Sequence, residues 1–221
     1  MYGLNIQIDP GDLELLYDLK KKIVLCRPPS FKPTVDKNNS DGWLVWCSMD
    51  AKPTIEVRWE QRYRIYSSDN KPNPYLEINK AACVFTSNDV CEQSIYIFKA
   101  YYCFVTEQKE DGGKGCYYAR NESGRNGVTF GMAQALDLTN SQQYEYMPYD
   151  AVQTANSDTV SFLPHNFIKI YLRFDDRAAS WKRTIGGVSS DPLFLDYEGK
   201  KQNTVLTVKY NAGKNIFELI S

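Results

Sequence analysis

A row of basic and aromatic side chains in "WEQRYRIYSSD", residues 59–69, is the first pattern in the chain that could bind a ligand. The stretch alternates as an extended strand does, so its side chains separate onto two faces. One face is mainly apolar and holds Val57, Trp59, Tyr63 and Ile65, with Gln61 as its polar member. The other face holds Arg58, Glu60, Arg62, Arg64 and Tyr66. We expect the apolar face to be buried, with Gln61 at a sheet edge or bonded to a buried partner.

A second row of the same type lies about a hundred residues further along the chain. Lys169, Tyr171 and Arg173 alternate with apolar residues, and Trp181 follows them. If the two strands are neighbours in one sheet, the two rows form one basic, aromatic patch. The predicted ligand-binding residues are therefore Arg58, Arg62, Arg64, Tyr66, Lys169, Tyr171, Arg173 and Trp181. The alternative is that both rows make ordinary cross-strand pairs with acidic neighbours on a solvated sheet.

Catalytic patterns are weaker. His165 is the single histidine, and no serine or cysteine motif accompanies it. Glu56 and Glu60 would lie roughly 13 Å apart along one strand, which is too far for the carboxyl pair of a glycoside hydrolase. No spacing suits a metal or a phosphate loop. We expect a protein that is not an enzyme and holds no metal or cofactor, and we keep a glycoside hydrolase with carboxylates from different strands as a third hypothesis.

Charge and composition exclude several classes of protein. The chain has 26 basic and 27 acidic residues, so no overall field favours nucleic acid. Its start, "MYGLNIQIDP", has no signal-peptide pattern and no run suits a membrane helix, which predicts a cytoplasmic protein as written, or one released later. No two of the six cysteines are separated by two residues, and we expect free thiols. Cys83 and Cys91 are the pair to test for a disulfide in an oxidising compartment.

Short alternating segments dominate the chain and predict an all-β protein. One short N-terminal helix is expected, with Asp9 as its cap and Pro10 in its first turn. We count about ten to twelve strands, which is typical of a β-sandwich or a partly closed barrel. No linker or repeat divides the chain, so residues 1–221 are expected to form a single domain.

Three segments receive more specific predictions. Residues 94–106 are expected to form one long strand, with "CYYAR" as the return arm of a hairpin. In "VTFGMAQALDL" the small row of Gly131, Ala133 and Ala135 predicts close approach by another layer, unless part of it forms a helical turn. Residues 139–166 are expected to be mainly loop, with a short strand at "TVSFL".

Two functions from different classes follow. The first is a soluble, non-enzymatic, lectin-like binding protein that presents tyrosine, tryptophan and arginine to a carbohydrate or glycoconjugate. The alternative is a defensive or cytolytic protein that docks on a membrane through Trp181 and the tyrosines of residues 144–149, and inserts residues 153–163. Oligomeric state does not follow from the sequence.

Overall fold

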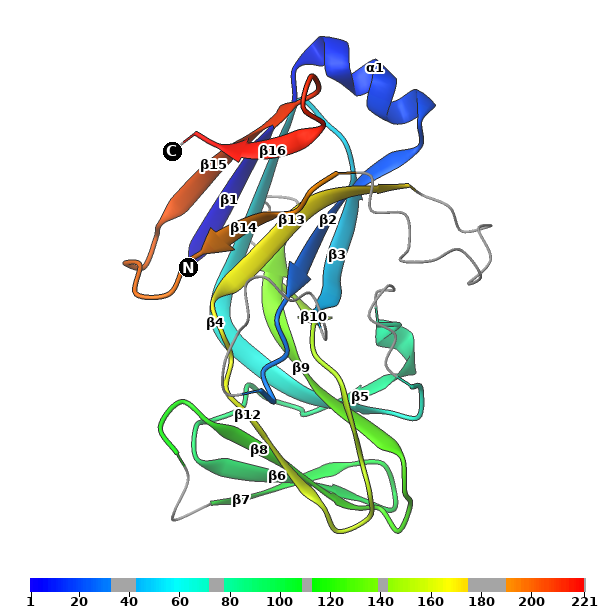
Figure 1. Ribbon diagram of the computed structural model, residues 1–221. Helices are drawn as coiled ribbons and strands as arrows, with labels where there is room; N and C mark the ends of the chain where they lie inside the picture. The colour runs from blue at the N-terminus through cyan, green and yellow to red at the C-terminus, as the bar shows by residue number, and fades with distance from the viewer. Residues whose placement is uncertain (33–42, 72–77, 109–112, 139–142, 175–189, 221) are drawn as a thin grey trace.

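The computed structural model describes residues 1–32, 43–71, 78–108, 113–138, 143–174 and 190–220 (Figure 1). These residues form sixteen strands, one α-helix and one short 3-10 helix. The prediction of an all-β, sandwich-like fold is confirmed. More strands are present than the ten to twelve expected, because several strands of three or four residues carry no alternating pattern in the sequence.

The largest sheet, sheet A, contains eight strands. Its order is β10 (Glu145–Pro148), β9 (Val128–Asp137), β4 (Thr54–Ser68), β1 (Tyr2–Gln7), β15 (Val205–Asn211) and β16 (Ile216–Leu219), with β11 (Val152–Thr154) paired to β9 and β5 (Cys83–Phe85) paired to β4. Most neighbours are antiparallel, but β1 and β15 are parallel. Parallel neighbours require a long connection, and here almost the whole chain separates them.

Two four-stranded sheets pack against sheet A. Sheet B has the order β14 (Leu193–Asp196), β13 (Phe167–Phe174), β2 (Lys21–Arg27) and β3 (Leu44–Asp50). Sheet C has the order β12 (Thr159–Phe162), β8 (Tyr117–Glu122), β6 (Ser94–Lys99) and β7 (Phe104–Gln108), and lies at the bottom of Figure 1.

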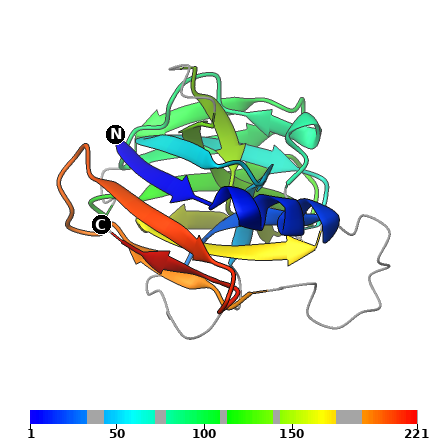
Figure 2. The same ribbon diagram turned by 90° about the horizontal axis from the view of Figure 1, so that it is seen from above.

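The helix α1 (Pro10–Asp18) follows β1 and lies across the opposite end of the molecule, nearest the viewer in Figure 2. The predicted helix is confirmed with Pro10 in its first turn, whereas the side chain of Asp9 makes no capping hydrogen bond. A short 3-10 helix, η1 (Lys80–Ala82), precedes β5. No helix within the described ranges is long and apolar enough to cross a lipid bilayer.

β4 packs against both smaller sheets, within one continuous hydrophobic core. Its predicted apolar row is buried, as expected. Between Trp59 and Tyr63 the strand contains two more residues than β9 opposite, which forms a β-bulge. A bulge bends its strand. Before the bulge the Trp59 ring meets Trp46 of sheet B at 5.9 Å, and after it the Tyr63 ring meets Tyr117 of sheet C at 5.7 Å.

Gln61 is exposed at this bulge, so it needs neither a buried partner nor a sheet edge. The bulge instead has a buried amide on the neighbouring strand: Gln134 Nε2 donates to the carbonyl oxygen of Glu60 at 2.8 Å. Because this contact satisfies a carbonyl that the irregular ladder leaves unpaired, it stabilises the bulge.

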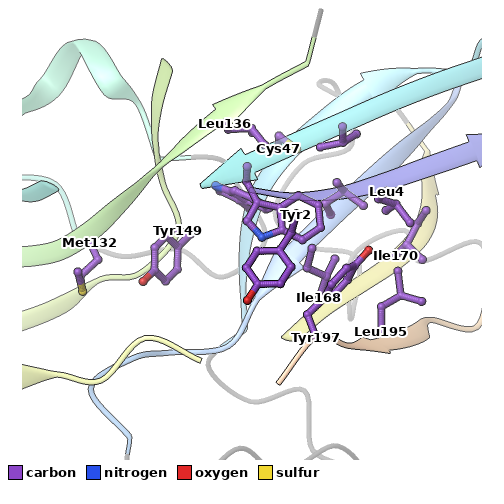
Figure 3. Close-up of a cluster of buried hydrophobic side chains, with 14 of the residues drawn as sticks. Tyr2, Leu4, Cys47, Met132, Leu136, Tyr149, Ile168, Ile170, Leu195 and Tyr197 are labelled. Atoms are coloured by element: carbon purple, nitrogen blue, oxygen red, sulfur yellow. The ribbon is translucent and has the colours of Figure 1, made fainter. Parts of the chain in front are cut away.

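The core between sheets A and B is built on aromatic rings. Trp59 packs on Tyr197 with ring centres 4.9 Å apart and on Tyr2 at 6.1 Å. Tyr197 also donates its hydroxyl hydrogen to the carbonyl oxygen of Gly3 at 2.8 Å. Figure 3 shows Tyr2 and Tyr197 surrounded by aliphatic side chains from both sheets. The Trp59–Tyr197 pair is edge-to-face and the Trp59–Tyr2 pair is stacked, and ring pairs of both kinds add stability beyond the area they bury.

The long strand predicted for residues 94–106 is wrong. The structure has two strands, β6 and β7, joined by a turn in which Tyr102 has a φ of 60°. β8 pairs with β6 in parallel, so "CYYAR" is not the return arm of a hairpin with β7. The aromatic run hides the turn, because Tyr101 and Tyr102 have strand-like composition but lie at its exposed tip.

The prediction for residues 139–166, mainly loop with one short strand, is confirmed only in part; residues 139–142 lie outside the described residues, and the others contain more strands than expected. They contain β10, β11 and β12, and only β12, at "TVSF", matches the short strand expected there. β10 and β11 both pair with β9. These short strands depend mainly on their hydrogen bonds to the long neighbouring strand β9.

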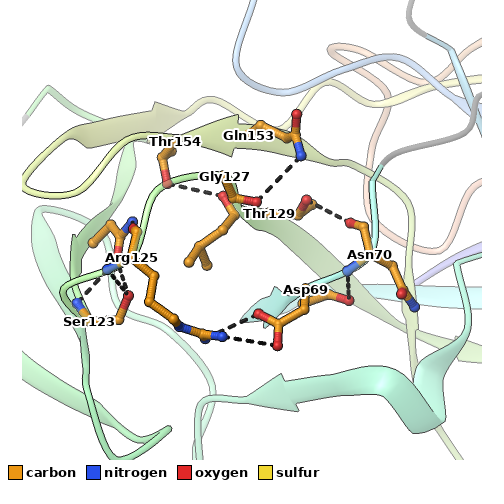
Figure 4. Close-up of polar contacts among 11 residues, drawn as sticks. Asp69, Asn70, Ser123, Arg125, Gly127, Thr129, Gln153 and Thr154 are labelled. Atoms are coloured by element: carbon orange, nitrogen blue, oxygen red, sulfur yellow. Dashed lines mark hydrogen bonds and ion pairs between the residues drawn. The ribbon is translucent and has the colours of Figure 1, made fainter.

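An arginine connects the loops at the lower end of the molecule. Arg125 forms two contacts of 3.1 Å with the carboxylate of Asp69 at the end of β4 (Figure 4). Its guanidinium also lies 4.7 Å from the centre of the Tyr102 ring. These contacts join the turn after β6, the loop after β8 and the end of β4.

The cysteines are free. Cys26 and Cys47 are buried in sheet B, as small apolar residues are, and Cys83 and Cys91 are not bridged to each other.

Gly131 confirms the close approach predicted for the small row of β9. Its partner across the strands is Tyr66, whose hydroxyl donates to the carbonyl oxygen of Asp150. A Cβ atom at Gly131 would lie 2.6 Å from the Tyr66 ring and closer still to that carbonyl oxygen. The strand assignment for β9 also excludes a helical turn in this segment.

We expect Gly131→Ala to destabilise the fold by about 3 kcal/mol or more, because neither the ring nor the backbone of residue 150 can move without breaking their hydrogen bond. Urea unfolding measures the change. Gly11→Ala in α1 is the matched control: no atom lies within 4 Å of its Cβ position, and alanine favours a helix. Gly131→Ala with wild-type stability would contradict the close packing.

Asp150 is a fully buried carboxylic acid. One of its oxygens accepts hydrogen bonds from the backbone and the hydroxyl of Ser30, and the other has no partner among the described residues. Burial raises the pKa of Asp150 from 3.8 to about 6. The folded protein therefore binds this proton more tightly than the unfolded chain does.

This difference predicts the direction of a pH effect. The contribution of Asp150 to stability is complete below about pH 4 and is lost as the pH rises through about 6, a change of about 3 kcal/mol. We expect the wild type to lose stability relative to Asp150→Asn over this interval. Chemical unfolding of both proteins at a series of pH values measures the difference, and a constant difference would contradict the raised pKa.

Candidate functional site

Ala133 and Ala135 of β9 are two short side chains on the outer face of sheet A. Across the strands Ala133 is paired with Arg64 of β4, and Ala135 with Tyr146 of β10. Both alanines are fully buried, although they lie on the face of sheet A that points away from the core. Since a methyl group is short, the long side chains on either side can extend over it and meet.

Two arginines of β4 lie on two tyrosines. The guanidinium carbon of Arg64 is 4.2 Å from the centre of the Tyr146 ring, and that of Arg62 is 5.6 Å from the Tyr144 ring. Arg62 Nε also donates to Glu60 at 2.6 Å. Cation–π contacts hold a guanidinium by its flat face and leave its N–H groups free at the edge.

The carboxylate of Asp89 contacts both arginines and Tyr146. The segment that carries Asp89 is fixed beside β4 by two backbone bonds of 2.9 Å, from the amides of Thr86 and Val90. Asp89 accepts a hydrogen bond from the hydroxyl of Tyr146. Its oxygens lie 3.8 Å from Arg62 Nη1 and from Arg64 Nε. Burial and the bond to Asp89 raise the pKa of Tyr146, so the phenol remains a donor at neutral pH.

Together these groups form an open pocket of about 550 Å³, which we call the β4–β10 pocket. It is lined by Arg62, Arg64, Asn88, Asp89, Tyr144 and Tyr146. Stacking, a hydrogen bond and ion pairs connect five of the lining residues, namely Arg62, Arg64, Asp89, Tyr144 and Tyr146. It combines fixed donors, one carboxylate and two phenols.

The other two predicted residues of β4 lie outside this pocket. Arg58 pairs with Glu56 on its own strand, with Nε 2.8 Å from the carboxylate oxygen. Tyr66 is completely buried below Asp150 and packs on Phe85. Tyr66 points to the same side of β4 as Arg62 and Arg64, but β5 and residue 150 cover that part of the sheet.

The two predicted rows do not form one patch, because β4 belongs to sheet A and β13 to sheet B. The apolar residues of both strands point into the same core, so their other rows point away from each other. Lys169 is buried, and its Nζ lies 4.3 Å from the centre of the Trp43 ring. The hydroxyl of Tyr171 lies 3.5 Å from the sulfur of Cys26. Arg173 is half-buried. Trp181 lies outside the described residues.

The remaining catalytic candidates have structural partners. Glu56 and Glu60 pair with Arg58 and Arg62. His165 is buried, with Nε2 2.9 Å from the carbonyl oxygen of Lys32. In the described part of the chain, no group of three acidic, histidine or cysteine side chains is placed to hold a metal ion.

The segments proposed for membrane docking are also part of the fold. Tyr149 is completely buried, and Tyr144 and Tyr146 belong to the pocket. Residues 153–163 contribute to β11 and β12, which are hydrogen-bonded to β9 and β8.

Sequence reasoning missed four of the six lining residues as partners of Arg62 and Arg64. Tyr144 and Tyr146 alternate in "QYEYMP", which is the only local sign of β10. Asn88 and Asp89 lie in the turn "TSND", which resembles any polar loop. Their meeting with β4 depends on pairings that no local pattern reveals.

Comparison of the chain with protein-family models, curated proteins and solved structures finds no match.

The hydrogen bond and the stacking contact of Tyr146 can be separated by mutation. We expect Tyr146→Phe to destabilise the protein by about 1 kcal/mol through loss of the bond to Asp89, while the ring stays on Arg64. Tyr146→Leu removes the ring as well and should cost about 0.5–1 kcal/mol more. Denaturant unfolding compares the three proteins. Identical stabilities would contradict the contacts of Tyr146 with Asp89 and Arg64.

Proposed function

We propose that this protein binds a carbohydrate or glycoconjugate in the β4–β10 pocket, without catalysing a reaction. The observation that carries the proposal is the pocket itself, in which Arg62, Arg64 and Asn88 supply donors and Asp89 supplies an acceptor around two tyrosines. Sugar hydroxyls are both donors and acceptors, so a site for them needs both kinds of group within a few ångströms.

The shape of the pocket supports a sugar over a buried cofactor. Sites for drug-sized molecules and cofactors are mostly apolar and enclose their ligand. The β4–β10 pocket is open and polar, which suits one or two residues of a larger glycan that extends into solvent. Its lining comes from β4, from β10 and the residue before it, and from a segment bonded to β4, so little ordering is needed on binding.

The predicted experiment is a glycan array followed by titration of the best ligand. We expect Arg62→Ala to weaken binding at least tenfold, because it removes both a donor group and the cation stacked on Tyr144. Arg120→Ala is the matched control: Arg120 also forms ion pairs, at 3.1 Å to Glu107 and 3.0 Å to Glu122, but lies in sheet C.

The control should bind as the wild type does. No dose-dependent binding across a broad array, or full affinity in Arg62→Ala, would contradict the proposal.

A further inference from the structure

We propose that the glycan bound in the β4–β10 pocket is acidic, and that its carboxylate lies between the guanidinium groups of Arg62 and Arg64. This inference rests on the proposed function and specifies its ligand class. It follows from which hydrogen-bonding groups of the pocket are already used and which are not.

The unused groups are donors. Among the described residues, none accepts a hydrogen bond from Arg64, and Arg62 uses only its Nε, on Glu60. The contacts of both arginines with Asp89 are 3.8 Å long, beyond hydrogen-bond distance. The terminal N–H groups of two neighbouring guanidinium ions therefore remain available to a ligand.

Asp89 makes no hydrogen bond to either arginine of the pocket in the described part of the chain. Its Oδ1 accepts the hydrogen bond of Tyr146, and its contacts with the two arginines are both 3.8 Å long. The six lining residues contain two positive charges and this single negative charge. Glu60, which lies beside the lining, is paired with Arg62 Nε, so an acidic ligand is bound by the terminal N–H groups of the two arginines and not by a net positive charge.

The geometry favours a carboxylate in particular. Arg62 and Arg64 are two positions apart on the same face of β4, which places their Cα atoms roughly 7 Å apart. Each guanidinium has a cation–π contact with a tyrosine ring, at 5.6 Å for Arg62 and 4.2 Å for Arg64, which limits its movement. A planar carboxylate matches the planar guanidinium fork with two parallel hydrogen bonds.

The role of Asp89 separates an acidic ligand from a neutral one. For a neutral sugar, Asp89 is the acceptor of hydroxyl hydrogens, so its removal weakens binding. For an acidic sugar, Asp89 is a like charge beside the ligand, so its removal strengthens binding. Asp89→Asn keeps an oxygen that can accept the hydrogen bond from Tyr146, removes the negative charge and replaces the other oxygen by an NH2 donor.

The experiment uses uronic-acid and sialic-acid glycans together with their carboxyl-reduced counterparts, which differ only in the acid group. We expect the acidic member of the best pair to bind at least about tenfold more tightly, as charge-assisted hydrogen bonds do. We expect Asp89→Asn to bind it about fivefold more tightly than the wild type, and affinity to fall as ionic strength rises. Asp69→Asn, whose carboxylate pairs with Arg125 outside the pocket, is the matched control and should leave affinity unchanged.

Arg64→Gln provides a second test, because it should weaken the acidic glycan at least tenfold while its reduced counterpart changes little. Equal affinity for the two members of each pair, or weaker binding of the acidic glycan by Asp89→Asn, would overturn the acidic assignment. If neutral glycans still bind in an Arg62-dependent way, the proposed function stands and only the ligand class is wrong. If no glycan binds, both fall.

Discussion

β4 accommodates two extra residues between Trp59 and Tyr63, and at this bulge sheet A turns from sheet B toward sheet C. An even number of added residues keeps the same row of side chains pointing inward on both sides of the bend. The same irregularity carries Arg62 at the outer surface, beside the pocket. The bend that allows one strand to pack against two sheets therefore also positions the first residue of the candidate site.

The small residues of β9 are the second half of this arrangement. Gly131 leaves room for Tyr66 and the carbonyl of Asp150, while Ala133 and Ala135 leave room for the stacked Arg64 and Tyr146. On the outer face of β9, the side chains are therefore closely packed near Gly131 and form an open pocket near Ala133 and Ala135. Larger side chains along this row would fill the volume that both parts need.

Sequence patterns predict the features that depend on local alternation. The inward row of β4, the short helix after β1 and the close approach at Gly131 all follow from residue spacing alone. The neighbours of each strand do not, because hydrogen-bond pairing joins segments that are far apart in the chain. Arg27 illustrates the limit: it lies in an apolar strand and is fully buried between the rings of Trp46 and Tyr149, each 5.1 Å from its guanidinium carbon. Its burial depends on rings from two other segments, and the pocket depends in the same way on β10 and residues 88 and 89.

The most direct test is a two-dimensional amide NMR titration of the isotope-labelled protein with the glycan that binds best. If the β4–β10 pocket is the binding site, the changes should be confined to residues 62–64, 88–89 and 144–146, and should saturate together with one dissociation constant. Changes centred on Lys169 and Tyr171 in sheet B, with the pocket resonances unmoved, would contradict it.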